Sequence, residues 1–238
     1  MRGMGGGPLI DLLAVGAHPD DIEIGAGGTV AELVRQGGSV ALLDLTNGEP
    51  TPHGSPEIRK KETAKANKAL KVSKRIMLGL KNRELMDIPD ARRKVAEVYR
   101  KLRPKIVIMP HWVDAHPDHV QASSLAQAAR FVAKLTKTDM EGEPHYPSRL
   151  FFYFCQHHKK NIQPTFIFDI SKTMGQKLKA LRAYQSQFFS RGKKLGDDFV
   201  GRVETRAKYF GAQIGVKYGE PFFSIEEIGV RSFDIFIP

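Results

Sequence analysis

The chain has 238 residues, of which 41% are hydrophobic and 26% are charged, a globular composition that argues against disorder. Its single cysteine, Cys155, excludes an intrachain disulfide and a cysteine-rich zinc module, and it favours a reducing, cytoplasmic location. Lys and Arg number 37 against 26 Asp and Glu, so the net charge of +11 permits binding of nucleic acid or of anionic small molecules.

The first half of the chain alternates short apolar runs with longer segments in which apolar residues recur at helical spacing. The runs predict strands at Ile10–Val15, Val40–Leu45, Arg75–Leu78 and Ile106–Met109. The other segments predict helices over Gly27–Gln36, Pro56–Leu70, Ala91–Leu102 and His119–Leu135. This order with short connections is typical of a doubly wound α/β fold with a mostly parallel sheet, and we expect one domain over residues 1–238.

The second half of the chain is less regular. We predict strands at Leu150–Phe154 and Thr165–Phe168 and helices over Met174–Phe188 and Val200–Phe210, with a basic, glycine-containing loop over Ser190–Gly196. The Gly-rich residues 1–8 are expected to form a frayed tail. No run approaches the roughly 18 consecutive apolar residues of a membrane span, so we expect a soluble protein with no membrane partner.

Two polar clusters come directly after predicted strands, at residues 17–29 and 114–119. Each contains a His-Pro-Asp triplet followed by another possible ligand, Asp21 in the first cluster and His119 in the second. Ligands of open α/β sheets bind outside the carboxyl ends of the strands. If both strands belong to one parallel sheet, the two clusters build one site although they lie about 100 residues apart.

The residue types in the clusters predict a metal centre. His18, Asp21 and His119 offer two imidazoles and one carboxylate, and three such ligands with an open position are common in catalytic zinc sites. Zinc lowers the pKa of bound water to roughly 7 and polarises a carbonyl. The same donors also serve iron, manganese or cobalt, so the residues leave the identity of the metal open.

The remaining polar members suit acid–base chemistry. Asp20 would take the proton of the activated water as the general base. His116 could donate a hydrogen bond to the developing oxyanion, with Asp118 holding its ring and favouring the imidazolium. Either cluster alone would also suit a turn or a helix cap, but two of them, each after a strand, favour a metal site.

Two rival functions remain open at this point. Gly25–Gly28 after a strand suggests a nucleotide-dependent oxidoreductase, although the spacing departs from G-x-G-x-x-G and acidic residues stand where a pyrophosphate would bind. The basic segment Arg59–Lys61 suggests a module that binds nucleic acid or polyanions, although helical spacing also makes it an ordinary solvated helix face. The acidic clusters argue against both rivals.

Residues 17–21 and 25–29 together with 116–119 resemble the PIG-L/LmbE family of zinc-dependent N-acetylglucosamine deacetylases. The resemblance implies a Rossmann-like fold with the zinc site at the carboxyl edge of the sheet. It implies zinc ligation by His18, Asp21 and His119, a general base at Asp20, and stabilisation of the tetrahedral intermediate by His116 and Asp118. These implied roles agree with those drawn from the residue types.

Further segments, including 169–171 and 184–188, resemble the bacterial branch that makes bacillithiol, which implies N-acetylglucosaminyl malate as substrate. Diacetylchitobiose or an inositol conjugate is the alternative. Arg59 is then a candidate carboxylate clamp, and Tyr184 is a candidate substrate contact. Independently of the resemblance, Trp112 follows a predicted strand and is either a stacking platform for the sugar or a packing residue. The resemblance also implies a homo-oligomer. Phe199 stands near the position where some relatives have a tyrosine, which leaves the substrate open.

Overall fold

The computed structural model describes residues 9–155, 157 and 163–233, and the strands in this part of the chain form one seven-stranded sheet of order β3-β2-β1-β4-β5-β7-β6. The strands are β1 (Leu12–Gly16), β2 (Val40–Thr46), β3 (Lys74–Leu80), β4 (Ile106–Pro110), β5 (Arg149–Tyr153), β6 (Phe166–Asp169) and β7 (Gly219–Phe223). The first five are parallel, whereas β7 runs antiparallel to both β5 and β6. The predicted Rossmann-like, mostly parallel sheet is therefore confirmed.

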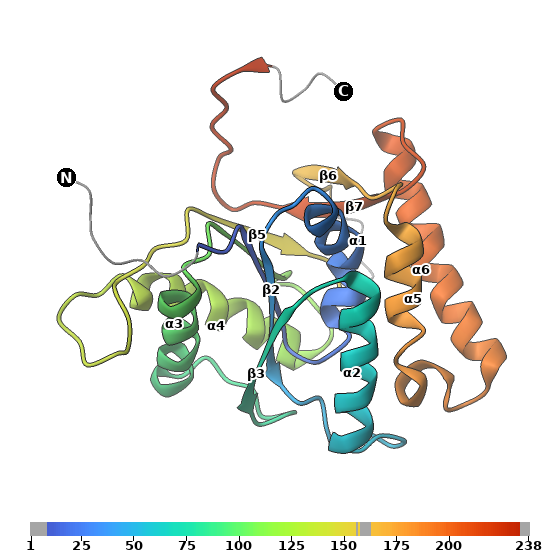
Figure 1. The fold of residues 1–238 in the computed structure, drawn as a ribbon, viewed down its shortest axis with the longest axis horizontal. Coiled ribbons are helices and arrows are strands. Elements are labelled where there is room, and N and C mark those ends of the chain that lie inside the picture. Colours follow the sequence, from blue (N-terminus) through green and yellow to red (C-terminus); the bar gives the residue numbers. More distant parts are fainter. Residues whose placement is uncertain (1–8, 156, 158–162, 234–238) are drawn as a thin grey trace.

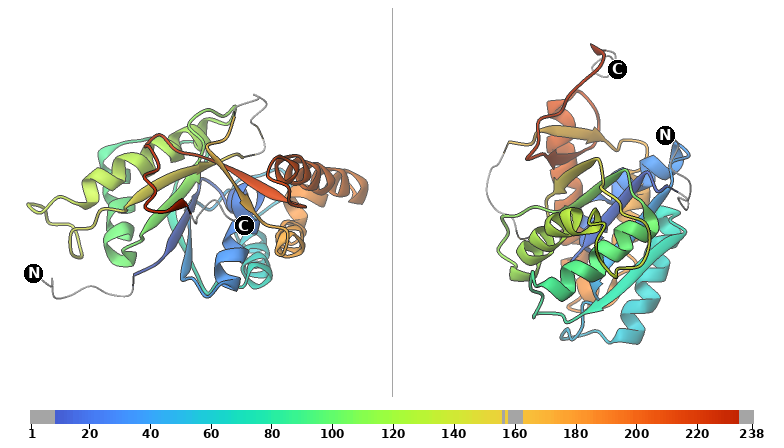
Figure 2. Two further views of the ribbon diagram at one scale, coloured as in Figure 1. Left: turned by 90° about the horizontal axis from the view of Figure 1, so that it is seen from above. Right: turned by 90° about the vertical axis from the view of Figure 1, so that its left-hand side faces the viewer.

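Helices cover both faces of the sheet, as Figures 1 and 2 show. The helices are α1 (Asp21–Arg35), α2 (Pro56–Leu70), α3 (Pro89–Leu102), α4 (Pro117–Ala133), α5 (Met174–Leu181), the π-helical turn η1 (Gln185–Phe189) and α6 (Lys193–Gln213). α3 and α4 lie on one face, and the others lie on the opposite face. Each residue of β1 and β2 is buried, because a parallel sheet with helices on both sides has no solvent-facing surface at its centre.

The α1 helix begins six residues earlier than its sequence predicts, at Asp21 rather than Gly27. Glycines weaken a helix locally, but here close packing requires them. A Cβ on Gly25 would lie 2.0 Å from the ring of Tyr153, and one on Gly28 would lie 2.6 Å from Ile170. The helix is broken at Ala26, where φ is −141°. Tertiary packing therefore accounts for the glycines within α1, on both sides of the break.

Other differences lie in the second half of the chain. The sequence did not predict β7, which contains Gly219, Glu220 and Pro221 and lacks a strand-like pattern. The predicted helix over Met174–Phe188 is two elements, α5 and η1, and α6 begins inside the predicted basic loop, at Lys193. The predicted frayed tail lies outside the described residues. Within the described part, every helix is too short or too polar to span a bilayer.

Candidate active site

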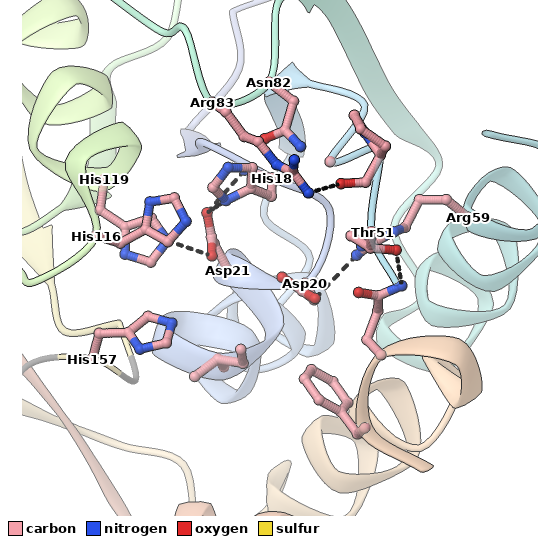
Figure 3. A pocket seen from close by; sticks show the side chains of 15 residues that line it. His18, Asp20, Asp21, Thr51, Arg59, Asn82, Arg83, His116, His119 and His157 are labelled. Atoms are coloured by element: carbon pink, nitrogen blue, oxygen red, sulfur yellow. Dashed lines mark hydrogen bonds and ion pairs between the residues drawn. The ribbon is translucent and has the colours of Figure 1, made fainter. Parts of the chain in front are cut away.

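The two His-Pro-Asp clusters meet at one edge of the sheet (Figure 3). β1 and β4 are adjacent parallel strands, so the loops that follow them emerge side by side at the position where the strand order reverses. Nε2 of His18 lies 3.1 Å from Oδ2 of Asp118, one hundred positions further along the chain. The expectation that the clusters form one site is confirmed.

His18, Asp21 and His119 bring their ligand atoms together at the floor of a cavity of about 310 Å³. Nδ1 of His18 lies 3.4 Å from Oδ2 of Asp21, and Nε2 of His119 lies 3.1 Å from Oδ1 of the same carboxylate. Zinc with bonds of about 2.1 Å in tetrahedral geometry holds its ligand atoms about 3.4 Å apart. The three side chains therefore fit a metal ion without rearrangement of the backbone.

The charges of these groups also fit a cation. Burial opposes the ionised form of Asp21, but the adjacent His119 and His18 hold its pKa well below the ordinary value. Burial would lower the pKa of His18, yet the Asp21 and Asp118 carboxylates raise it to about 9. The carboxylates therefore favour a positive charge at both histidines. A bound metal ion would supply this charge in place of the protons on the imidazole rings.

Three overlapping donor sets occur among the described residues: His18–Asp21–His119, His18–His116–Asp118 and Asp114–His119–Cys155. The members of the first set are all buried and all line the cavity. Asp118, Asp114 and Cys155 do not line it. A metal that acts on a substrate needs an open coordination position, so the first set is the one placed for chemistry.

Asp20 lines the same cavity and has an unusual backbone conformation, with φ at 119°. A non-glycine residue in this region is strained, and such strain persists where the surrounding structure imposes it. Burial raises the pKa of its carboxyl to about 7, although the Arg59 guanidinium opposes the shift. A carboxyl with such a pKa can both accept and release a proton near neutral pH.

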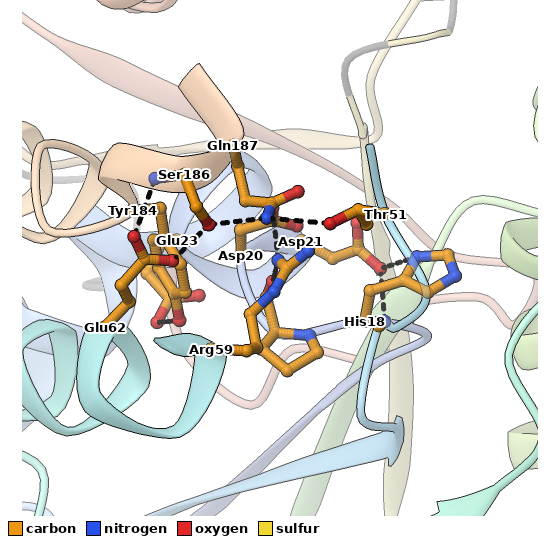
Figure 4. A network of polar contacts seen from close by, with 12 residues as sticks. His18, Asp20, Asp21, Glu23, Thr51, Arg59, Glu62, Tyr184, Ser186 and Gln187 are labelled. Atoms are coloured by element: carbon orange, nitrogen blue, oxygen red, sulfur yellow. Dashed lines mark hydrogen bonds and ion pairs between the residues drawn. The ribbon is translucent and has the colours of Figure 1, made fainter. Parts of the chain in front are cut away.

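Arg59 lies in the cavity wall, but its guanidinium is already engaged (Figure 4). Nη1 donates to the Pro19 carbonyl at 2.7 Å and to Asp20 Oδ2 at 3.1 Å, and Nε lies 3.3 Å from Oε1 of Glu49. The side chain is only 3% exposed. These contacts orient Asp20, and they leave little of Arg59 for the carboxylate clamp that the resemblance implies.

His116 and Asp118 differ from their predicted pairing. The Asp118 carboxylate contacts His18 and accepts from the backbone N–H of Arg83 at 2.8 Å, rather than holding the His116 ring. Nδ1 of His116 instead accepts from the Asp118 backbone N–H at 3.2 Å. Burial and the nearby histidines lower the pKa of His116. The predicted imidazolium is therefore wrong for this geometry, which favours a neutral ring with its proton on Nε2.

Two predicted substrate contacts lie away from the cavity lining. Tyr184 is fully buried, and its hydroxyl donates to Oε1 of Glu23 at 3.0 Å beneath the site. Trp112 is 38% exposed, and it stacks on His111 with 4.0 Å between the ring centroids. Neither side chain lines the cavity. Both have a packing partner that accounts for their positions.

Several side chains that line the cavity were not predicted, among them Thr51, Asn82, Arg83 and Gln187. Asn82 and Arg83 follow β3, the strand next but one to β1. The rule that singled out the segments after β1 and β4 would have found these as well, had it been applied to every parallel strand. His157 also lines the cavity, whereas its neighbour His158, another histidine of the same sequence segment, lies outside the described residues.

Comparison with known proteins identifies the family to which the chain belongs. The family model described as PIG-L, GlcNAc-PI de-N-acetylase, matches residues 13–130. Diacetylchitobiose deacetylase of Thermococcus kodakarensis is 33% identical over 224 residues, which cover 88% of this chain and 80% of that protein. The chain belongs to the PIG-L family. It is accordingly a metal-dependent amidohydrolase that deacetylates N-acetylglucosamine-containing substrates.

Two solved structures resemble this chain over most of its length, and the second of them is a deacetylase. The conserved protein TT1542 from Thermus thermophilus is 41% identical with a TM-score of 0.86, over 93% of this chain and 97% of that one. The N,N'-diacetylchitobiose deacetylase from Pyrococcus horikoshii is 30% identical with a TM-score of 0.77, over 89% and 82% of the two chains. Both structures therefore match most of the length of this PIG-L protein.

The oxidoreductase rival is also inconsistent with the packing of the glycine segment. The backbone N–H groups of Gly28 and Thr29 donate to the Glu220 carboxylate at 2.9 and 2.7 Å. A dinucleotide fold uses such N–H groups to bind a pyrophosphate. In this PIG-L protein a side chain of the same chain already occupies them, so the glycines serve packing.

Proposed function

We propose that this deacetylase uses zinc held by His18, Asp21 and His119, and that its substrate is N-acetylglucosaminyl malate. The observation that carries the zinc proposal is the buried triad whose ligand atoms lie within 4.8 Å of one another, beside Asp20 at the cavity floor. Zinc bound there would act as a Lewis acid on the acetyl carbonyl and make the nucleophilic water more acidic. A cytoplasmic location and a homo-oligomer remain part of the proposal.

Asp20 is the proton carrier of the reaction. Its carboxylate takes a proton from the attacking water and later gives it to the amine nitrogen of the departing sugar, so that acetate and a free amine result. The contact between Asp20 and Arg59 fixes the carboxylate that faces the cavity. General-base catalysis is most effective when the pKa of the base lies near the working pH, and the pKa of about 7 meets this condition.

His116 stabilises the charge that develops on the carbonyl oxygen. Because Nδ1 accepts a backbone hydrogen bond, the neutral ring carries its proton on Nε2. A neutral imidazole that lines the cavity can donate this proton in a hydrogen bond to the oxyanion. Asp118 acts through His18, whose ring it orients from the side opposite Asp21.

The test is release of free amine from N-acetylglucosaminyl malate, diacetylchitobiose and N-acetylglucosamine, with and without a chelator. We expect chelator-sensitive turnover, highest with the malate conjugate. Asp20→Asn should retain one zinc per chain and lose about 10²- to 10⁴-fold in kcat. Full activity of Asp20→Asn would exclude it as the base, and a preference for diacetylchitobiose would move the protein to the alternative substrate while keeping the zinc chemistry.

A further inference from the structure

Arg83 is a second arginine at the cavity, and its environment differs from that of Arg59. It is exposed and lines the cavity from the loop between β3 and α3. Its Nη2 donates to the Pro50 carbonyl at 2.6 Å. Among the residues that the structure describes, no carboxylate lies within ion-pair distance of its guanidinium, whereas Arg59 has both Asp20 and Glu49.

The position of Arg83 is fixed from its backbone. Its φ is 67°, and its N–H donates to Asp118 Oδ2 at 2.8 Å. The same carboxylate oxygen lies 3.1 Å from Nε2 of His18. The Arg83 backbone is therefore linked through the Asp118 carboxylate to the histidine at the cavity floor, so that the base of this side chain is held at the rim (Figure 3).

We propose that Arg83 is the specificity-determining residue that binds an anionic group on the part of the substrate attached to the sugar. This inference rests on the proposed deacetylase site, and it names the substrate class as N-acetylglucosamine conjugates that carry a carboxylate. A guanidinium presents several N–H donors in a planar fork that matches a carboxylate. Arg83 has this fork at the cavity with one N–H engaged by a neutral carbonyl, whereas the charge of Arg59 is already balanced by two acids.

The neighbouring side chains suit the rest of such a substrate. Asn82, Thr51 and Gln187 line the same cavity and offer amide and hydroxyl groups to sugar hydroxyls. Gln187 Nε2 lies 3.3 Å from the Thr51 hydroxyl, which ties η1 to the loop after β2. The cavity thus combines a floor of histidines and carboxylates, walls with neutral polar groups and the ion-paired Arg59, and a second, exposed guanidinium, that of Arg83. A conjugate with its acetamide on the floor would direct its anionic end toward Arg83.

The test compares Arg83→Ala and Arg83→Lys with Lys81→Ala, a change of an exposed cation in the same loop whose ammonium pairs with Glu84. The measured quantity is the ratio of kcat/KM for N-acetylglucosaminyl malate to that for diacetylchitobiose. A lost hydrogen bond to a charged group corresponds to about a 10- to 100-fold change. We expect Arg83→Ala to lower the ratio by this factor, Arg83→Lys to lower it less, and Lys81→Ala to leave it within twofold.

A second measurement uses free malate as an inhibitor of diacetylchitobiose hydrolysis, and its Ki should rise about 10-fold or more in Arg83→Ala. Zinc content and urea unfolding of each variant identify any loss of folding. We expect none, because Ala and Arg have a similar energetic cost in a backbone conformation with positive φ. An unchanged ratio in Arg83→Ala, whether or not both activities fall, would overturn the role of Arg83 and leave the proposed deacetylase function intact. Absence of turnover on every N-acetyl sugar in the wild type would overturn the proposed function itself, and this inference with it.

Discussion

A buried ion pair behind the active site supplies a sharp test of how the break in α1 is stabilised. Lys177 from α5 contacts Glu220 from β7, and each side chain is 2% exposed. Glu220 also accepts from the N–H groups of Gly28 and Thr29 and from the Thr29 hydroxyl, at 2.9, 2.7 and 2.6 Å. Lys177 Nζ donates to the Ile24 carbonyl at 2.8 Å, on the other side of the break.

The geometry predicts that a variant in which both Lys177 and Glu220 are replaced is less stable than the wild type. Replacing a simple buried ion pair by apolar residues is often neutral or stabilising by about 1–4 kcal/mol. Here the loss of Glu220 also leaves three buried donors without an acceptor, at about 1–3 kcal/mol each. The orphaned donors outweigh the gain, so the double variant Lys177→Met with Glu220→Leu should be destabilised by about 3 kcal/mol.

The single variants should differ in a defined order. Lys177→Met leaves a carboxylate that still has three donors, and we expect a loss of about 3 kcal/mol, at the low end for a broken buried pair. Glu220→Leu leaves both the ammonium and the three donors unpaired, so its loss should be the largest of the set. Lys179→Met, an exposed lysine on the same helix, should change stability by less than about 0.5 kcal/mol.

Urea unfolding followed by circular dichroism gives the free energies of unfolding of the four variants. A double variant as stable as the wild type would refute the reasoning, because it would mean that the Gly28 and Thr29 donors contribute nothing beyond the ion pair.

Three further predictions concern metal binding, packing and pH. His119→Ala should lose stoichiometric zinc on dialysis while His145→Ala, whose Nε2 bonds the Pro104 carbonyl, retains it; metal analysis showing full zinc in the first would exclude the ligand assignment. Gly25→Ala should be less stable by about 1–3 kcal/mol or more in urea unfolding, because its Cβ would meet the Tyr153 ring. Gly175→Ala, with open space around it, should be neutral or slightly stabilising, and equal behaviour of the two glycines would contradict this view of α1. A side-chain hydrogen bond from Lys105 lowers the pKa of Asp11 to about 2, so the folded state gains stability above the unfolded pKa of about 4 and loses it as the pH falls toward 2. Asp11→Asn should therefore be less stable by at most about 1 kcal/mol at pH 7, with the difference shrinking below pH 4, and a difference that does not change with pH would count against this ion pair.

The parallel half of the fold was predictable because each of its strands is a short apolar run between helical segments. The predicted helix over Pro56–Leu70 agrees with α2 at both ends, since Pro at the first position and the periodic apolar residues mark it locally. β7 carries no such local signal, because its residues pair with β5 and β6 only after the whole sheet has formed. The break at Ala26 depends likewise on Glu220, which lies 192 positions from Gly28.

The membership of the site followed from residue types and the order of strands, but its electrostatics did not. The order of the strands places His18 and Asp118 at the same edge of the sheet. Side-chain geometry then determines that the Asp118 carboxylate contacts the ring of His18 rather than that of His116. A sequence gives two neighbouring carboxylates, Asp20 and Asp21, with the same ordinary pKa. Only the surroundings in the folded chain make the two pKa values differ.

That separation is the physical basis for dividing the two roles between adjacent residues. Asp21 faces two histidines, which hold its pKa low and keep it anionic as a metal ligand must be. Asp20 is largely buried, with its side chain 14% exposed and one guanidinium 3.1 Å away, and burial raises its pKa to about 7. The φ of 119° at Asp20 turns the chain between them, so that consecutive side chains enter different surroundings. If Arg59 serves mainly to position Asp20, Arg59→Lys should lower kcat on anionic and neutral substrates alike, because a single ammonium cannot hold Pro19, Asp20 and Glu49 together. A loss confined to anionic substrates would return the carboxylate clamp to Arg59 and remove it from Arg83.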